Sequence, residues 1–121
     1  MKENIIVNKS YKFALEVIKI YKQMLKQNEY VLSKQLLRSG TSIGANVEEA
    51  IAGISRKDFT AKMNIACKEA RETRYWLRLI QEGNLLADST EIQSLTEHAD
   101  ELVRILTSII KTTQQNVKQH S

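Results

Sequence analysis

Residues 55–84 read SRKDFTAKMNIACKEARETRYWLRLIQEGN, and this stretch decides the fold class. Apolar or small residues recur in it at alternating steps of four and three residues. The row consists of Phe59, Met63, Ala66, Ala70, Thr73, Leu77 and Ile80. These positions share one face of a helix with 3.6 residues per turn, so the stretch predicts one long amphipathic α-helix.

Both ends of this predicted helix carry sequence signals. Ser55 is expected to cap the free amides of the first turn, and Asp58 places a negative charge at the positive helix start. Ile54 and Phe59 occupy the two positions of a hydrophobic staple around that cap. Residues 83–84, Gly-Asn, tolerate the left-handed conformation that closes helices, so the helix is expected to end there.

The preceding segment predicts a helix that opens at Ser33, with Leu32 and Leu37 as the staple around that cap. Its core positions are Leu36, Gly40, Ile43, Val47, Ala50 and Ile54. Each of its two glycines costs a helix about 1 kcal/mol relative to alanine, so a loop across residues 39–44 is the competing interpretation. A continuous helix is favoured because the periodicity passes both glycines without a change of phase.

The two outer segments repeat the pattern. A first helix is predicted from about Lys9 to Gln27, and its face consists of Ala14, Val17, Ile18, Tyr21, Met24 and Leu25, widened by Phe13 and Ile20. A last helix is predicted to open at Asp88, with Glu91 completing a capping box. Its stripe consists of Ile92, Leu95, Ala99, Leu102, Leu106 and Ile109, broadened by Val103 and Ile110. Residues 114–121 are polar and expected to fray, which leaves residues 1–113 as the folded domain.

The composition supports an all-helical domain. The 121 residues include no proline and only four glycines. The sequence therefore lacks the turn-forming residues that β-sandwiches and β-barrels require. Short connections between long amphipathic helices favour antiparallel neighbours. We therefore expect an all-α, antiparallel up-down-up-down four-helix bundle. A long coiled coil is disfavoured because capping signals recur about every 25–30 residues.

Residue counts also exclude several kinds of protein. One cysteine rules out an intrachain disulfide framework, and two histidines are too few for a structural zinc cage. Glu97 directly precedes His98 and Glu101 follows it by three, so the Glu-x-x-His pairs of di-iron bundles are absent. No apolar run approaches the ~20 residues of a membrane span. We expect a cytoplasmic protein without metal, cofactor or membrane segment.

Three motifs resemble a known bacterial family. They are RSGTSIGANVEEA at residues 38–50, SRKDF at 55–59 and IACKEARETRYWL at 65–77. Together they resemble the four-helix-bundle proteins encoded in 23S rRNA intervening sequences, a family similar to the accessory variability determinant of diversity-generating retroelements. The positions that match the family pattern are Arg38, Ser42, Asn46, Glu49 and Glu72. The resemblance implies an up-down bundle that often assembles as a homopentamer, a nucleic-acid role, and a protein partner such as a reverse transcriptase.

Positive charge is distributed unevenly along the chain. Residues 1–30 hold six basic and three acidic side chains, residues 55–84 hold seven and four, and residues 85–121 hold three and five. The candidates for phosphate contacts are Lys12, Lys19, Lys22 and Lys26 in the first helix and Arg71, Arg74 and Arg78 in the third. A solvated helix face or an acidic protein partner explains the same pattern, and no motif for reading base sequence is visible.

The second and third helices carry a candidate subunit interface. The outward side of the second helix, including Ser39, has mostly small residues, which let another helix approach closely. Ile65, Trp76 and Leu79 form an extra apolar stripe on the third helix, with Trp76 as the expected anchor and charged neighbours setting the register. The candidate residues are Arg38, Ser42, Asn46, Glu49, Ile65, Glu69, Glu72, Trp76 and Leu79. The alternative is that an isolated bundle buries the stripe between its own helices.

Two single residues have plain structural interpretations. Asn46 is expected to hydrogen-bond a neighbouring backbone or side chain. Cys67 follows Ala66 on a packed helix and is expected to be a small buried hydrophobic group. A role as a nucleophile is disfavoured because His98 and His120 have no spacing that suggests a base. The sequence therefore favours a non-enzymatic homo-oligomer that presents a basic surface to RNA or DNA as an accessory factor. A protein-interaction scaffold without a nucleic-acid role is the alternative.

Overall fold

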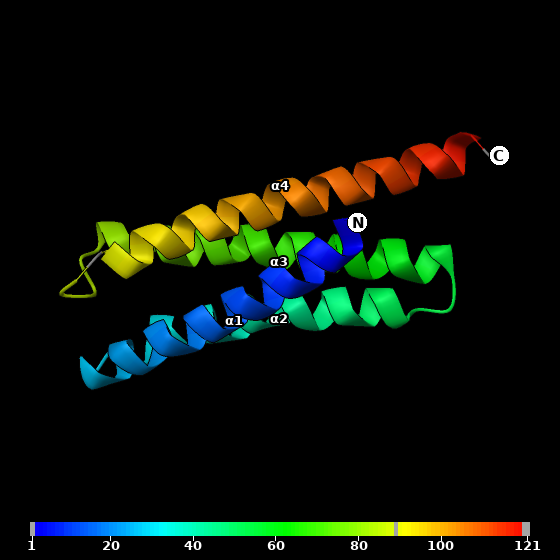
Figure 1. Ribbon diagram of the computed structural model, residues 1–121. Helices are drawn as coiled ribbons and strands as arrows, with labels where there is room; N and C mark the ends of the chain where they lie inside the picture. Colours follow the sequence, from blue (N-terminus) through cyan, green and yellow to red (C-terminus); the bar gives the residue numbers. More distant parts are fainter. Residues whose placement is uncertain (1, 89, 120–121) are drawn as a thin grey trace.

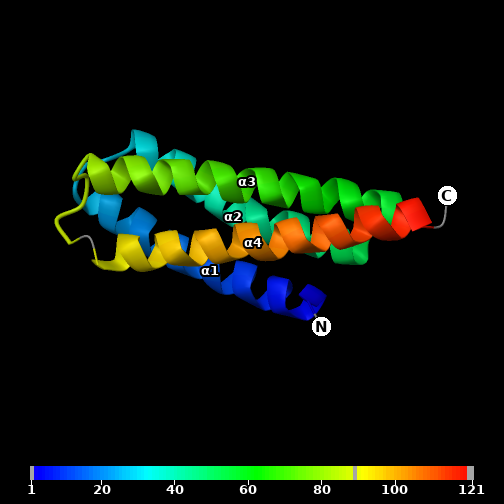
Figure 2. The same cartoon turned by 90° about the horizontal axis from the view of Figure 1, so that it is seen from above.

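The computed structural model describes residues 2–88 and 90–119 and folds them into four α-helices (Figure 1). They are α1 (Lys2–Lys26), α2 (Val31–Ala52), α3 (Arg56–Glu82) and α4 (Thr90–Gln119). Each helix runs antiparallel to the next, and α1 also packs against α4, so the helices surround one core (Figure 2). The predicted all-α four-helix bundle is confirmed. None of the described helices is apolar over a stretch long enough to cross a membrane.

The pattern that predicted α3 is confirmed. The predicted core row of this helix is buried, apart from Phe59, which is half-buried. The Ser55 hydroxyl accepts a hydrogen bond from the Asp58 amide at 3.0 Å, so the predicted cap forms. The helix ends where expected because Asn84 adopts the left-handed conformation, with φ at 53°.

α2 is continuous through both of its glycines, so the competing loop across residues 39–44 is wrong. A Cβ atom on Gly40 would lie 2.7 Å from Cγ2 of Val17, and one on Gly44 would lie 3.4 Å from the carbonyl oxygen of Ser10. The glycines therefore let the α2 backbone approach α1 closely. The close packing this permits offsets the roughly 1 kcal/mol that each glycine costs the helix.

The predicted Ser33 cap of α2 is wrong. The helix begins at Val31, Ser33 is fully buried inside it, and the Ser33 hydroxyl finds no hydrogen-bond partner among the described residues. Leu32 and Leu37 therefore do not occupy staple positions. The Glu29 carboxylate instead accepts a hydrogen bond from the Ser33 amide at 3.1 Å. Sequence inspection missed this contact because a glutamate before the helix is not among the residues preferred as caps.

Ile54, predicted as the last core residue of α2, is 97% exposed. The helix ends at Ala52, and Gly53 adopts an extended conformation with ψ at 147°. The chain therefore leaves the helix before Ile54 can reach the core. The predicted staple between Ile54 and Phe59 fails for the same reason.

α1 differs from its prediction in extent and in phase. It begins at Lys2, well before the expected start at Lys9. Its buried row consists of Ile6, Ser10, Phe13, Val17, Ile20 and Met24. Several residues predicted at the centre of the core face are only half-buried: Ala14, Ile18, Tyr21 and Leu25. The apolar stripe of α1 is wider than its core face, so periodicity alone does not locate the centre of that face.

The stripe predicted for α4 is confirmed, and Asp88 caps the start of the helix as predicted. Asp88 accepts a hydrogen bond from the Thr90 amide at 2.9 Å, which lowers the pKa of the Asp88 carboxyl. Glu91 does not complete the capping box and instead contacts α1. The helix continues to Gln119, past residue 113 where the sequence places the end of the folded domain, and residues 120–121 lie outside the described part of the chain.

Candidate nucleic-acid interface

Three arginines of α3 lie on the side of the helix that faces α4. Arg71, Arg74 and Arg78 recur at steps of three and four residues, so they share one side of α3 next to its buried row. Together with Tyr75 they line a depression of about 380 Å³, to which α4 contributes Asp100. The structure therefore brings together the three α3 arginines that the sequence predicts.

A second depression of about 550 Å³ adjoins the first, since Arg71 lines both. Lys68 of α3 and Lys111 of α4 contribute cations from its two walls, and Cys67 and Ile110 add apolar surface. We call the two depressions together the basic groove. Its charged residues are Lys68, Arg71, Arg74, Arg78, Asp100 and Lys111.

The cations of the basic groove differ in how closely carboxylates approach them. Nη1 of Arg74 lies 3.4 Å from Oδ1 of Asp100, and Nε of Arg78 lies 3.9 Å from Oε2 of Glu82. Among the described residues, three cations of the groove form no ion pair, namely Lys68, Arg71 and Lys111. Within the described part of the chain, five cations and one carboxylate thus line the groove, which gives it a positive potential that attracts anions.

The lysines predicted as phosphate contacts in α1 lie on a separate surface. They are Lys12, Lys19, Lys22 and Lys26, and all four are exposed. In the described part of the chain α1 packs against α2 and α4 and not against α3. α4 therefore stands between these lysines and the basic groove (Figure 2). The predicted cations form two surfaces on one chain rather than one.

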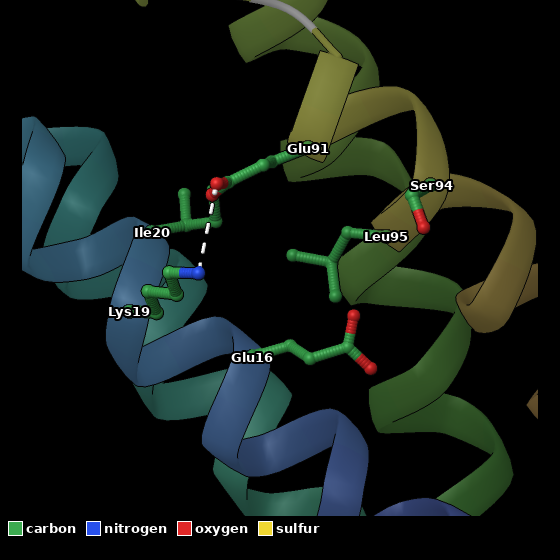
Figure 3. Close-up of a pocket in the computed structure, with 6 residues that line it drawn as sticks. All are labelled: Glu16, Lys19, Ile20, Glu91, Ser94 and Leu95. Carbon is green, nitrogen blue, oxygen red and sulfur yellow. Dashed lines mark ion pairs between the residues drawn. The ribbon is translucent and has the colours of Figure 1, made fainter.

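Opposite charges alternate where α1 meets α4, a line of contact that we call the α1–α4 seam. Nζ of Lys19 lies 3.7 Å from Oε1 of Glu91, and Glu16 lines the same depression (Figure 3). Farther along the seam, Nζ of Lys9 lies 3.1 Å from Oε1 of Glu101. Nearby carboxylates thus offset cations along the seam, which weakens its attraction for anions.

The residues predicted as a subunit interface gather on the outer side of α2 and α3, which we call the α2–α3 face. Arg38 of α2 forms ion pairs with Glu69, at 3.2 Å, and with Glu72 of α3. The indole N–H of Trp76 donates a hydrogen bond to Glu72 at 3.0 Å. Charges expected to set the register between subunits therefore pair within one chain. Ile65 remains 41% exposed on this face.

Polar residues of α2 near this face show mixed agreement with the predictions. The side-chain amide of Asn46 donates to the Ser42 carbonyl at 2.9 Å, so its predicted structural role is confirmed. Glu49 forms an ion pair with Lys62 of α3 at 2.9 Å. Ser39, predicted to face outward, is fully buried, and its hydroxyl lies 2.9 Å from that of Thr73. Ser39 points inward because α3 packs beside it.

Three charged residues of the basic groove are absent from the candidates that the sequence predicts, namely Lys68 of α3 and Asp100 and Lys111 of α4. Asp100 and Lys111 lie on one side of α4 together with Thr107 and Gln114, at steps of seven, four and three residues. That spacing is visible in the sequence. Nothing in the spacing, however, indicates that this side of α4 meets the arginines of α3, because the contact joins residues distant in the chain.

Cys67 is buried, as predicted, and its sulfur lies 3.7 Å from the Thr107 hydroxyl. His98 lies on the α1–α4 seam, with Nδ1 3.1 Å from a carboxylate oxygen of Glu16. The described residues contain no cluster of three or more His, Cys, Asp and Glu side chains that could hold a metal ion.

Comparison with known proteins identifies the family. Residues 2–108 match the profile of the family described as 23S rRNA-intervening sequence protein. A solved structure from Bacteroides thetaiotaomicron VPI-5482, described as a protein of unknown function from the S23 ribosomal protein family, is 46% identical to this chain. The alignment covers 92% of this chain and 99% of that one, with a TM-score of 0.87. A search of curated proteins finds no match. The chain belongs to the family of 23S rRNA-intervening sequence proteins.

Proposed function

We propose that this protein is a cytoplasmic, non-enzymatic, homo-oligomeric accessory factor that binds RNA or DNA through the basic groove. The observation that carries the proposal is the lining of that groove, where the described residues supply five cations from two helices and a single carboxylate. Phosphate backbones bind such surfaces because each neutralised phosphate releases condensed counterions. The lysines of α1 belong to a different surface and are secondary in this role.

Oligomerisation would strengthen this binding. In a symmetric assembly every subunit contributes one copy of the groove, so weak contacts at one chain add as avidity. The α2–α3 face supports self-association because Ile65 and Leu79 remain 41% and 36% exposed beside the half-buried Trp76. We expect native mass spectrometry to detect an oligomer, with a pentamer favoured by the family resemblance. A monomer alone at micromolar concentration would remove this part of the proposal.

Salt dependence tests the binding proposal. We expect the affinity for a labelled oligonucleotide to fall steeply as salt rises, and the variant K68Q/R71Q/K111Q to lose most of the affinity and of the salt slope. A charge-matched control, K34Q/R56Q/K57Q, removes three exposed cations outside the groove and is expected to bind like the wild type. Absence of binding at low salt, or equal losses in the two variants, would refute the proposal.

A protein-interaction scaffold is the second candidate function. The exposed apolar residues of the α2–α3 face favour it, because such residues anchor protein partners as well as sister subunits. Capture of partners from the native cell lysate, with and without nuclease, separates the two functions. Partners lost on nuclease treatment support nucleic-acid binding, whereas partners that survive treatment and are lost in the variant I65E support the scaffold.

A further inference from the structure

Tyr75 is an aromatic side chain of the basic groove. It lies between Arg71 and Arg78 along α3 and lines the same depression. Its side chain is 48% exposed. An aromatic side chain about half open to solvent and groups suited to bind phosphate therefore share one opening.

Two neighbouring side chains hold the Tyr75 ring in place. Trp76 packs against it edge-to-face, with ring centroids 5.2 Å apart and planes at 67°. The guanidinium carbon of Arg78 lies 6.0 Å from the ring centroid, within the range of a cation–π contact. Trp76 is itself fixed by its hydrogen bond to Glu72. A ring already ordered in this way loses little freedom when a ligand stacks on it.

Cations and ring follow one another along α3. Lys68, Arg71, Tyr75 and Arg78 recur at steps of three, four and three residues, which separates neighbours by about 4.5–6 Å and spans about 15 Å along the helix. Lys111 adds a cation from α4 near Lys68 and Arg71. A nucleic-acid strand whose phosphates follow this row of cations keeps its bases within reach of the Tyr75 ring.

We propose that the basic groove binds single-stranded nucleic acid, with one unpaired base stacked on Tyr75 and phosphates held by Lys68, Arg71 and Lys111. This inference rests on the proposed function and names its ligand class. In a duplex the faces of the bases are covered by neighbouring base pairs, and a protein reaches only base edges and backbone. Unpaired bases expose their faces, and aromatic side chains beside cationic groups bind them without sequence preference.

The test compares three DNA probes of equal length: a labelled oligothymidine strand, its duplex with oligoadenine, and an abasic strand. We expect Tyr75→Ala to weaken binding of the oligothymidine strand by about 5- to 100-fold, which corresponds to the loss of one base–aromatic stack. Binding of the duplex and of the abasic strand stays within about twofold, because phosphate contacts are kept. Tyr75→Phe retains the ring and is expected to bind like the wild type.

Tyr11→Ala is the matched control, since Tyr11 is 57% exposed on α1, away from the groove. Thermal melting of each variant checks that the bundle still folds. If Tyr75→Ala misfolds, the stacking is tested by comparing the oligothymidine strand with the abasic strand on the wild type and on Tyr75→Phe. Equal losses for all three probes, or no loss for oligothymidine, would overturn the single-strand inference while the groove remains a phosphate-binding site. Failure of the wild type to bind any of these probes or an oligouridine RNA strand at low salt would instead overturn the proposed function.

Discussion

The basic groove and the α1–α4 seam are both lined by cations, and they differ in what faces those cations. At the seam, Lys9 and Lys19 of α1 each meet a carboxylate of α4. In the groove, Asp100 of α4 pairs with Arg74, whereas Lys68, Arg71 and Lys111 form no ion pair within the described residues. The comparison shows that the number of basic residues does not locate an anion-binding surface. What matters is how many of them the adjoining helix neutralises with carboxylates.

The largest difference in oligonucleotide affinity is expected between two variants, one that lacks three cations of the groove and one that lacks three cations of the seam. The groove variant K68Q/R71Q/K111Q loses oligonucleotide affinity, and its salt slope for a single strand falls by about 2, or about 0.7 per phosphate contact. The seam variant K9Q/K12Q/K19Q changes binding little. It lowers the melting temperature instead, because Glu101 and Glu91 lose their partners Lys9 and Lys19. The comparison fails if the seam variant loses as much affinity as the groove variant.

A gain of affinity is expected from Asp100→Asn. Asp100 is the carboxylate that lines the groove, and it pairs with Arg74. Its neutralisation frees Arg74 for phosphate and removes a repulsive charge, so affinity rises by up to about fivefold. Glu101→Gln on the seam, also a removal of one negative charge from α4, is the control and leaves affinity unchanged. Lower affinity in Asp100→Asn would contradict the assigned role of the groove.

How much of the groove and the seam the sequence predicts depends on how far apart in the chain the contacting residues lie. The stripe of α3 and the clustering of Arg71, Arg74 and Arg78 follow from helical periodicity, so both were predictable. The contributions of Lys111 and Asp100 were not, because they require knowledge of which side of α4 meets α3. The prediction that Ile54 belongs to the core of α2 is wrong for a local reason. The extended conformation of Gly53 ends the helix before the apolar periodicity of the sequence ends.

A smaller effect is expected from a double-mutant cycle across the seam. The Lys9–Glu101 pair joins side chains that are 43% and 39% exposed, so solvent screens their attraction. We expect a coupling energy of roughly 0.2–1 kcal/mol from the unfolding free energies of Lys9→Gln, Glu101→Gln and the double variant. A value of zero would show that the alternating charges of the seam contribute nothing to stability, although they still neutralise its potential.

The smallest effect concerns Asp88, at the start of the helix that the two regions share. Its hydrogen bond from the Thr90 amide lowers the pKa of the Asp88 carboxyl below the ordinary value of 3.8. A lowered pKa means that the stabilisation is complete above the unfolded value and is lost as pH falls through the folded one. We expect Asp88→Ala to melt slightly below the wild type at neutral pH, and the difference to vanish in strong acid. A difference that grows on acidification would reverse this sign.

Photo-crosslinking of an oligothymidine strand to the wild-type protein, followed by mass spectrometry of the crosslinked peptides, tests most directly whether the groove rather than the seam receives nucleic acid. We predict adducts on α3 at Tyr75 and its flanking cations, and on α4 at Lys111, with few on α1. Adducts concentrated at Lys9, Lys12 and Lys19 of α1 would contradict the account.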